Sequence, residues 1–540
     1  MPRLGRSSRK LPLRAASAAC AVALVLTAAA CSSGSSGGSG TAATTGAAST
    51  TSAAPVAGGS SGTLHLAFLS DMSTPDPDVF YDIEGNTVIL STYEGLVQYK
   101  PGTTQIEPDL AQSFSVSKDG LTYTFHLRHG VLFHDGTPFD AAAAKASFER
   151  RLEVNSAPAY MLKPVAQMLT PNKYTFVVKL KQVVTPFLDY LASSWGPKML
   201  SPTALKLHAG KDFGQTYLNT HDIGTGPYEL TAFVRGSHYT LTRFAKYWGP
   251  APAYQTVDIA ITPDMNSQIL ALKAGDQDAI LHSFPTPELA SIQSDPDLVV
   301  DNFDSYLTAL LYMNVSSGPL TSLPLRKEIA EAIDVPDLVK EVYGDYGSVA
   351  QSMYPKGILP PGEAPISYPP KAVKVNGIKL SFAYTADDSG LQQRLAELIQ
   401  QKLEAAGFSV SVREVQNAQT YGYPTDVKSA PDLLLETNTP DAAHPDTWGR
   451  IVWGTGGGLN FFDYSNPKVD ALMDKGRQTT NKAASDQDYV KAGEMMAADY
   501  PILFLASSQN VMVWRKSVTG VTFRPEEPWT VPVQSLAGTG

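Results

Sequence analysis

Apolar and polar positions alternate with two different periods in the second half of the chain, and they predict a strand, a helix and a second strand. An apolar run at 378–384 is followed by a helical pattern at 391–406 and by another apolar run at 408–413. The helical segment repeats its apolar residues as a helix with one buried face does; they are Leu391, Leu395, Leu398, Ile399 and Leu403. Gly407 stands where this helix would end, and a further run at 432–435 predicts a buried neighbouring strand.

A similar order of elements is predicted earlier in the chain. A strand at 256–262 precedes a helix at 266–274, Gly275 marks the end of that helix, and a short strand follows at 278–281. Units of this kind build α/β proteins. Two separate units predict an α/β fold in two lobes, with a cleft between the lobes where ligand sites usually form.

Antiparallel strands are predicted as well. Segments 228–233 and 238–243 flank a turn at Gly236 and predict a hairpin. Residues 121–128 alternate between apolar and polar side chains, which predicts a strand with one buried face; that face carries Tyr123, Phe125 and Leu127. We therefore expect β-rich inserts beside the two α/β units.

The composition of the 540 residues narrows the class of protein. Hydrophobic residues make up 43% and charged residues 17% of the chain, which excludes a wholly disordered chain and a protein with many membrane spans. The net charge of −10 argues against nucleic-acid binding, because that needs clustered positive charge. Two cysteines are too few for a disulfide-stapled scaffold or for a cysteine-based zinc site.

The N-terminal region predicts an export signal and a tether. Residues 1–30 place their basic residues before an alanine-rich apolar run, in the order of a signal peptide. Cys31 follows three alanines and resembles the cysteine of a bacterial lipobox, which becomes the acylated first residue; ordinary cleavage and free secretion are the alternative. Residues 31–62 are mostly Ser, Gly, Thr and Ala, a tether composition that favours the anchor. We expect an exported protein, held on the outer face of the cytoplasmic membrane by lipidated Cys31.

Many short motifs, each weak alone, follow one another between residues 63 and 535. In chain order they are YEGL (93–96), PDLA (108–111), KDGLTYTF (118–125), FHDGTP (133–138), GTGPY (224–228), YWG (247–249), GDQD (275–278), LR (325–326), AID (332–334) and PDL (431–433). Their order and spacing resemble the family 5 extracytoplasmic solute-binding proteins, the dipeptide-, oligopeptide- and nickel-binding subunits of ABC importers. Taken singly, the glycine-containing motifs are typical of turns, and we assign them to the fold.

The resemblance implies a two-lobed α/β clamshell of the periplasmic-binding-protein kind. Lobe I would comprise residues 63–302 and 506–540, with a β-rich subdomain inserted at about 100–215. Lobe II would comprise residues 303–505. The chain would cross between the lobes twice, near 303–314 and 504–507, and these crossings would form the hinge on which the lobes close.

The resemblance also implies a function. We expect a substrate-binding lipoprotein that captures short peptides by lobe closure and delivers them to the permease and ATPase subunits of an ABC importer. Such a protein is a monomer that needs no cofactor and no metal, and it performs no covalent chemistry. Binding of a nickel chelate or an oligosaccharide on the same scaffold, or ligand sensing without import, are the alternatives.

A peptide's free amine needs a carboxylate partner when it is buried. In peptide-binding members of the family an aspartate in a segment Asp-x-x-acid-Pro supplies it; Asp441 matches this aspartate, and His444 replaces the acid. The alternative for Asp441 is capping of the next helix. Other residues expected at the ligand are Tyr93, Glu94, Trp195, Trp448, Trp453 and Asn460. For the last two tryptophans, burial in the core is an equal alternative.

Enzyme functions fit the sequence less well. Gly-x-Ser-x-Gly occurs at 34–38 and 58–62, but both copies lie in the tether, without the strand and helix that a nucleophilic serine needs. His126, His129 and His134 do not share one face of a strand, and no His-Glu-x-x-His motif is present. A secreted hydrolase and a metalloenzyme are therefore disfavoured.

Overall fold

The computed structural model describes residues 62–282, 286–359, 366–386 and 390–539. The predicted signal peptide, Cys31 and the tether up to residue 61 lie outside these ranges, so lipidation of Cys31 stays a prediction. Within the described ranges, no helix combines the length and the apolar character that a membrane span requires.

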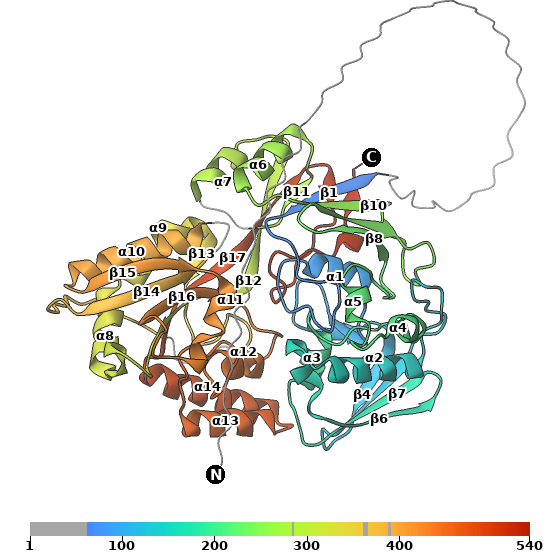
Figure 1. Ribbon diagram of the computed structural model, residues 1–540, viewed down its shortest axis with the longest axis horizontal. Coiled ribbons are helices and arrows are strands. Elements are labelled where there is room, and N and C mark those ends of the chain that lie inside the picture. The colour runs from blue at the N-terminus through green and yellow to red at the C-terminus, as the bar shows by residue number, and fades with distance from the viewer. Residues whose placement is uncertain (1–61, 283–285, 360–365, 387–389, 540) are drawn as a thin grey trace, which may run out of the picture. The chain divides into compact units, whose positions relative to one another are not determined.

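Two four-stranded sheets form in the first half of the chain (Figure 1). The first sheet has the order β1-β10-β9-β8, in which β1 runs parallel to β10 and the other pairs are antiparallel. Its strands are β1 (Thr63–Phe68), β8 (Tyr228–Val234), β9 (His238–Arg243) and β10 (Thr256–Ile261). The predicted hairpin is confirmed, because β8 and β9 pair directly across the turn at Gly236.

The second sheet is wholly antiparallel, with the order β4-β5-β7-β6. Its strands are β4 (Ala111–Val116), β5 (Thr122–Leu127), β6 (Val165–Asn172) and β7 (Thr175–Leu180). In β5 the side chains of Tyr123, Phe125 and Leu127 are buried, as the alternation predicts. This sheet lies within the range 100–215 where a β-rich insert is predicted, and its standing as a separate subdomain stays a prediction.

The remaining elements of the first half are short strands and helices. They are β2 (Val97–Tyr99), β3 (Ile106–Pro108), α1 (Asn86–Thr92), α2 (Ala141–Val154), α3 (Phe187–Ala192), α4 (Pro202–His208), α5 (Gln215–Leu218) and the 3₁₀ helix η1 (Ala157–Leu162). Asp140 caps α2, because its side chain accepts hydrogen bonds from two backbone N–H groups of the first turn.

The third and largest sheet has seven strands, in the order β11-β17-β12-β16-β14-β15 with β13 paired to β17. The strands are β11 (Ala279–Ile280), β12 (Leu298–Met313), β13 (Gly347–Val349), β14 (Lys379–Thr385), β15 (Ser409–Val415), β16 (Leu433–Asn438) and β17 (Ile502–Arg515). A last pair joins β18 (Val518–Thr519) to β19 (Ala537–Gly538).

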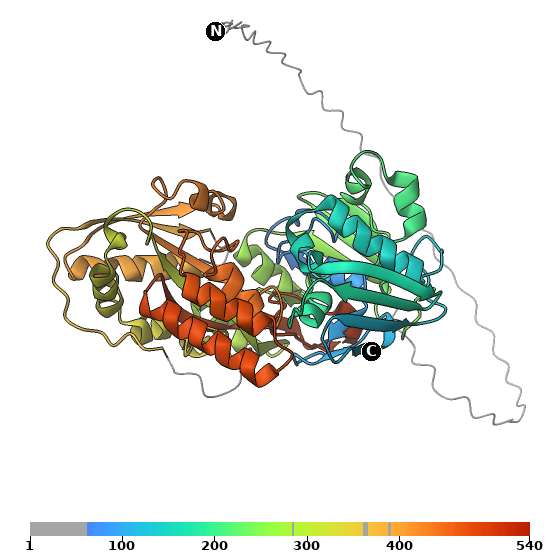
Figure 2. The same ribbon diagram turned by 90° about the horizontal axis from the view of Figure 1, so that it is seen from below.

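Nine helices and four further 3₁₀ turns complete the second half of the described chain. The helices are α6 (Met265–Ala274), α7 (Thr286–Gln293), α8 (Leu323–Ala332), α9 (Val335–Tyr343), α10 (Leu391–Ala405), α11 (Asn417–Thr420), α12 (Pro445–Val452), α13 (Pro467–Arg477) and α14 (Lys482–Ala498), of which α11 is a single turn. The 3₁₀ turns are η2 (Pro319–Thr321), η3 (Gly344–Tyr346), η4 (Tyr423–Thr425) and η5 (Val533–Ser535). Figure 2 shows α13 and α14 side by side.

One of the two predicted α/β units forms as expected. Strands β14 and β15 are parallel neighbours joined by α10, and β16 pairs with β14 on its other side. The other unit is different, because β10 belongs to the first sheet whereas β11 pairs antiparallel with β17 in the large sheet. Helix α6 therefore links two sheets, and the prediction of one continuous unit there is wrong. Gly275 ends α6 with a φ of 88°, as expected.

The buried hydrophobic residues separate into distinct cores. One core is built from residues 64–281 and 512–536, and we call the part of the chain around it lobe I. Two further cores draw on residues 309–506, and we call that part lobe II. The exact lobe boundaries predicted from the sequence remain a proposal.

Strands β12 and β17 pass from lobe I to lobe II as an antiparallel pair. The pairing is interrupted by register shifts between Asp304 and Thr308 and between Ala309 and Leu310. A register shift bends a strand locally and removes ladder hydrogen bonds. These irregularities fall where the sequence places a hinge, and hinge motion at this point stays a prediction.

The glycine motif at 224–228 serves close packing. A Cβ on Gly224 would lie 2.0 Å from the carbonyl oxygen of Thr92, and one on Gly226 would lie 2.4 Å from that of Ser91. No side chain fits at such distances from main-chain atoms of α1. The motif therefore belongs to the fold, as we predicted.

Candidate functional site

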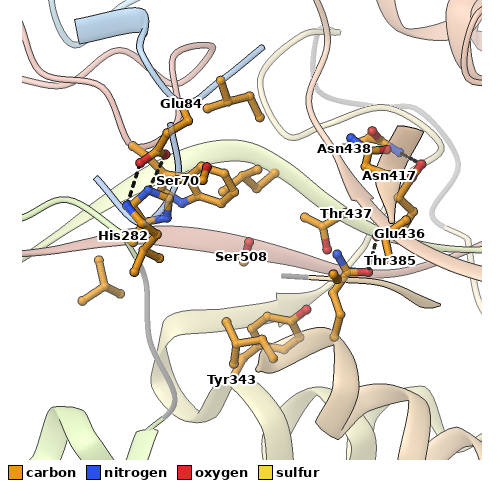
Figure 3. A pocket seen from close by; sticks show the side chains of 18 of the residues that line it. Ser70, Glu84, His282, Tyr343, Thr385, Asn417, Glu436, Thr437, Asn438 and Ser508 are labelled. Carbon is orange, nitrogen blue, oxygen red and sulfur yellow. Dashed lines mark hydrogen bonds and ion pairs between the residues drawn. The ribbon is translucent and has the colours of Figure 1, made fainter. Parts of the chain in front are cut away.

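A cavity of about 280 Å³ lies between the two lobes (Figure 3). Ser70, Glu84 and His282 come from lobe I, and Glu436 and Asn438 come from the end of β16 in lobe II. In Figure 3 these two groups lie on opposite sides, with Ser508 of β17 between them. The other residues that line the cavity include Asp82, Tyr343, Tyr346, Thr385, Gln392, Asn417, Thr437 and Trp529.

On the lobe I side, a buried contact between a histidine and a glutamate forms part of the wall. His282 Nε2 lies 2.6 Å from Glu84 Oε2, and the backbone N–H of Leu69 donates to Glu84 Oε1 at 2.9 Å. The His282 ring stacks on Trp529 with ring centroids 4.5 Å apart. Both oxygens of Glu84 therefore have partners within lobe I.

On the lobe II side, Glu436 is 3% exposed. Asn438 Nδ2 donates to its Oε2 at 2.8 Å, whereas no group of the described residues meets Oε1 with hydrogen-bond geometry. The nearby Thr420 hydroxyl donates instead to the main-chain oxygen of Asn417 at 2.7 Å. Burial raises the pKa of Glu436 to about 7, because the charged form loses its hydration. This carboxyl group therefore titrates near neutral pH.

Asp441 is buried where the two lobes meet. The hydroxyl groups of Tyr81 and Tyr160, both in lobe I, each donate to its Oδ2 at 2.5 Å. The hydroxyl of Ser193 donates to its main-chain oxygen at 2.5 Å. Burial raises the pKa of Asp441 to about 6, although the two phenols oppose the shift. The side chain that caps α12 is that of His444, which accepts from the N–H of Asp446, so the capping alternative for Asp441 is wrong.

A phenol at the lobe boundary connects Asp441 to the cavity. Burial, followed by the negative charges of Glu436, Asp82 and Asp441, raises the pKa of Tyr421 to about 12. Two of these carboxyl groups, those of Asp82 and Glu436, line the cavity. Asp441 thus lies within electrostatic reach of the cavity wall, although it does not line the cavity itself.

Trp195 is the predicted site residue that supports this region from lobe I. Its Nε1 donates to the carbonyl oxygen of Asp82 at 2.8 Å, and its ring meets that of Tyr81 edge to face at 5.8 Å. Trp195 is itself 5% exposed. It therefore positions the segment that carries Tyr81 and Asp82, and direct contact of Trp195 with a ligand stays a prediction.

Trp448, Trp453 and Asn460 lie inside lobe II. Both tryptophans are fully buried in one core, and Trp448 Nε1 donates to the carbonyl oxygen of Met353 at 2.8 Å. The Asn460 side chain donates to the carbonyl oxygens of Gly454 and Tyr464 and holds their loop together. These residues do not line the cavity that contains Glu436, and their predicted ligand contacts remain predictions.

Tyr93 and Glu94 lie in the interior of lobe I. The Tyr93 hydroxyl accepts from the N–H of Ile223 at 3.3 Å. Glu94 accepts from Tyr247 Oη at 2.8 Å and from Trp248 Nε1 at 3.1 Å. Neither side chain is among those that line the cavity, and their predicted role at the ligand is likewise untested.

The acidity of Glu94 leads to a prediction about stability. Burial, followed by the charge of Asp109, raises the pKa of Glu94 from 4.5 to about 8. Between these two values the folded protein binds a proton that the unfolded chain releases, so stability falls as the pH rises, by at most about 1.4 kcal/mol per pH unit. Glu94→Gln should flatten this slope in urea unfolding at pH 5.5 and 7.5. An unchanged slope would show that Glu94 titrates normally.

Several residues of the cavity wall and of the hydrogen bonds around Asp441 carry no recognisable sequence signal. Glu84, His282, Tyr81 and Tyr160 belong to no motif that points to a ligand. Glu436 is the exception, because it directly follows the strand predicted at 432–435, and ligands often meet the ends of strands in α/β sheets. In the part of the chain that the structure describes, no group of three His, Cys, Asp or Glu side chains is placed to hold a metal ion.

Comparison with known proteins agrees with this architecture. Residues 105–460 match the family model of the bacterial extracellular solute-binding proteins, family 5. The probable D,D-dipeptide-binding periplasmic protein DdpA of Escherichia coli K12 is 28% identical over 474 residues, which cover 84% of this chain and 90% of that protein.

Two solved structures show the same fold. The periplasmic binding protein DppA of Helicobacter pylori, in complex with the peptide STSA, superposes with a TM-score of 0.77 at 23% identity and covers 88% of this chain and 98% of its own. NikZ of Campylobacter jejuni, in complex with Ni(L-His), has a TM-score of 0.77 at 22% identity. The superposition covers 88% of this chain and 99% of the NikZ chain.

The two-lobed α/β fold predicted from the motif series is therefore confirmed. The family model spans well over half of the chain and includes the cavity residues of lobe II up to β16. The chain belongs to family 5 of the bacterial extracellular solute-binding proteins.

Proposed function

We propose that this protein is the extracytoplasmic receptor of an ABC importer, and that it captures short peptides between its lobes and releases them unaltered to the permease. A dipeptide appears in the name of DdpA, and a tetrapeptide is bound in the H. pylori structure. In this proposal lipidated Cys31 holds the protein at the membrane, and the protein acts as a monomer without catalysis.

The observation that carries the proposal is the cavity enclosed between the lobes. Strand β16 contributes Glu436, Thr437 and Asn438 to its wall. The ladder between β14 and β16 ends at Leu435, so these three residues follow the last described pair on that side. A strand edge of this kind can pair with the N–H and C=O groups of an extended peptide, whatever its side chains.

Closure of the lobes would bring the amine of such a peptide to Asp441. The carboxylate of Asp441 belongs to lobe II, whereas the two phenols that bind it belong to lobe I. A peptide ammonium could replace a phenol at this oxygen and compensate a charge that is otherwise costly to bury. Ligand affinity would then favour the closed arrangement of the lobes.

A thermal-shift screen of the purified protein tests the ligand class. Dipeptides and tetrapeptides should raise the melting temperature, because a ligand present at a hundredfold excess over its Kd stabilises the folded state by about 2.7 kcal/mol. Ni(L-His) complexes and oligosaccharides form the other arms of the screen, since a nickel complex is bound in the C. jejuni structure. Stabilisation by those arms alone would contradict the peptide assignment.

Asp441→Asn tests the amine site directly. The amide keeps an oxygen for the two phenols but removes the charge, so affinity for free-amine peptides should fall about 30-fold, as expected for a charge-assisted hydrogen bond. Binding of N-acetylated peptides should change little, as calorimetry would show. Asp337, which is exposed on α9 and pairs with Lys402 on the surface, provides the matched control, Asp337→Asn. Equal losses for both peptide classes would remove Asp441 from the amine site.

A further inference from the structure

We infer that the cavity selects solutes with a net positive charge, such as short peptides with a basic side chain. This inference rests on the proposed function and names its substrate class. It follows from the charges that line the cavity and from one carboxylate oxygen that lacks a partner.

The charges of the cavity wall are unbalanced. Asp82, Glu84 and Glu436 contribute carboxyl groups, and His282 contributes an imidazole. No Lys or Arg is among the described residues that line the cavity. Because His282 is already paired with Glu84, it leaves the other two carboxyl groups without a cationic partner in the wall.

Glu436 provides the independent observation. Its side chain is only 3% exposed, and no group among the described residues meets Oε1 with hydrogen-bond geometry. The Thr420 hydroxyl lies near this carboxyl group, but it donates to the main-chain oxygen of Asn417 at 2.7 Å. A buried carboxylate oxygen without a partner is costly, and nearly all such oxygens in folded proteins are satisfied. An ammonium or guanidinium group of a ligand would satisfy this oxygen and neutralise its charge.

Other parts of the wall suit a cation equally well. The side-chain amide of Asn417 and the hydroxyl of Thr437 offer polar atoms near the β16 end. The rings of Tyr343 and Trp529 line the same cavity, and aromatic faces attract ammonium and guanidinium groups. A hydrocarbon side chain that ends in a positive charge therefore matches both the apolar and the acidic parts of the wall.

The same wall disfavours an anionic group. A free carboxylate of a peptide would face three acidic side chains, with no described Lys or Arg in the wall to compensate it. Like charges at close range oppose binding strongly and serve proteins as a means of discrimination. A peptide carboxylate should therefore lie outside the cavity or be absent.

The test is isothermal titration calorimetry of the full-length protein at pH 7.5. The probes are the amides of Ala-Lys, Ala-norleucine and Ala-Glu, which differ mainly in the charge of one side chain, together with 1,5-diaminopentane. Ala-Lys amide should bind about 30-fold more tightly than Ala-norleucine amide, as expected for a hydrogen bond between charged groups. Glu436→Gln should reduce this ratio to near one, while Glu404→Gln on the exposed face of α10 should leave it unchanged.

The outcomes separate the inference from the proposed function. Equal affinity for the lysine and norleucine amides, or tightest binding of Ala-Glu amide, would overturn the inference and leave the peptide receptor in place. Binding of the diamine without any peptide would support the inference and overturn the peptide assignment. Failure of every probe to bind would overturn both. The ratio in the unaltered protein decides the matter even where Glu436→Gln does not fold.

Discussion

Replacing Arg151 with methionine should lower the free energy of unfolding by about 3–5 kcal/mol, the cost of leaving a buried charge without its partner. Arg151 is fully buried in α2. Its Nε donates to Asp78 Oδ1 at 2.7 Å, and its two Nη atoms donate to the carbonyl oxygens of Trp195 and Pro77 at 2.6 and 2.8 Å. Methionine fills a similar volume but supplies none of these hydrogen bonds.

The loss should extend from stability to binding. Arg150, the neighbour of Arg151, donates to Asp76 and Asp78, so that two arginines of α2 hold one loop of lobe I. The same loop continues into Tyr81 and Asp82. Weakening its attachment should therefore displace the wall of the cavity and lower ligand affinity together with stability.

Urea unfolding and calorimetry measure the two effects. Lys145 lies on the same helix, and its ion pair with Glu149 is exposed, so Lys145→Met should change stability by about 0.5 kcal/mol or less. Arg151→Lys keeps the positive charge but has fewer donors, and we expect a smaller loss than for methionine. A loss below about 1 kcal/mol for Arg151→Met would contradict the role given to this network.

The sequence predicts the local elements well because their signals are local. The stripe of leucines in α10 and the alternation in β5 report burial of one face, and both are observed. Gly275 and Gly407 mark the ends of their helices with positive φ angles of 88° and 96°. The family motifs predict the lobed architecture because they contain the glycines and turn residues that the tight turns and close packing of this fold require.

Long-range pairing carries no comparable signal. The separation of β10 and β11 into two sheets depends on partners far away in the chain, so a local pattern cannot reveal it. The cavity has the same property, because Glu84 meets His282 and Asp441 meets Tyr81 across large sequence distances. From the sequence, a tryptophan next to glycines, such as Trp453, is equally compatible with contact to a ligand and with burial in the hydrophobic core. The structure buries Trp453 in the core.

The affinity for a cationic peptide amide should fall by roughly 800-fold between pH 7.5 and pH 5, because binding is linked to two titrating carboxyl groups. Burial raises the pKa of Glu436 to about 7 and that of Asp441 to about 6 in the free protein. A bound cation favours the ionised form of each, so protonation at lower pH opposes binding. The phenols that face Glu436, those of Tyr312 and Tyr421, have raised pKa values and stay neutral throughout this range.

Calorimetry of Ala-Lys amide across this pH range checks the profile. Glu436→Gln should remove the part of the decline centred near pH 7, and Asp441→Asn the part centred near pH 6. A slope that persists in the double variant would show that these two carboxyl groups are not the groups linked to binding. Urea unfolding at each pH is the control for the folded state, because the raised pKa values of Glu436 and Asp441 favour folding at lower pH whereas the lowered pKa of the buried His444 opposes it. A flat affinity profile in the unaltered protein would show that neither carboxyl group meets the cation.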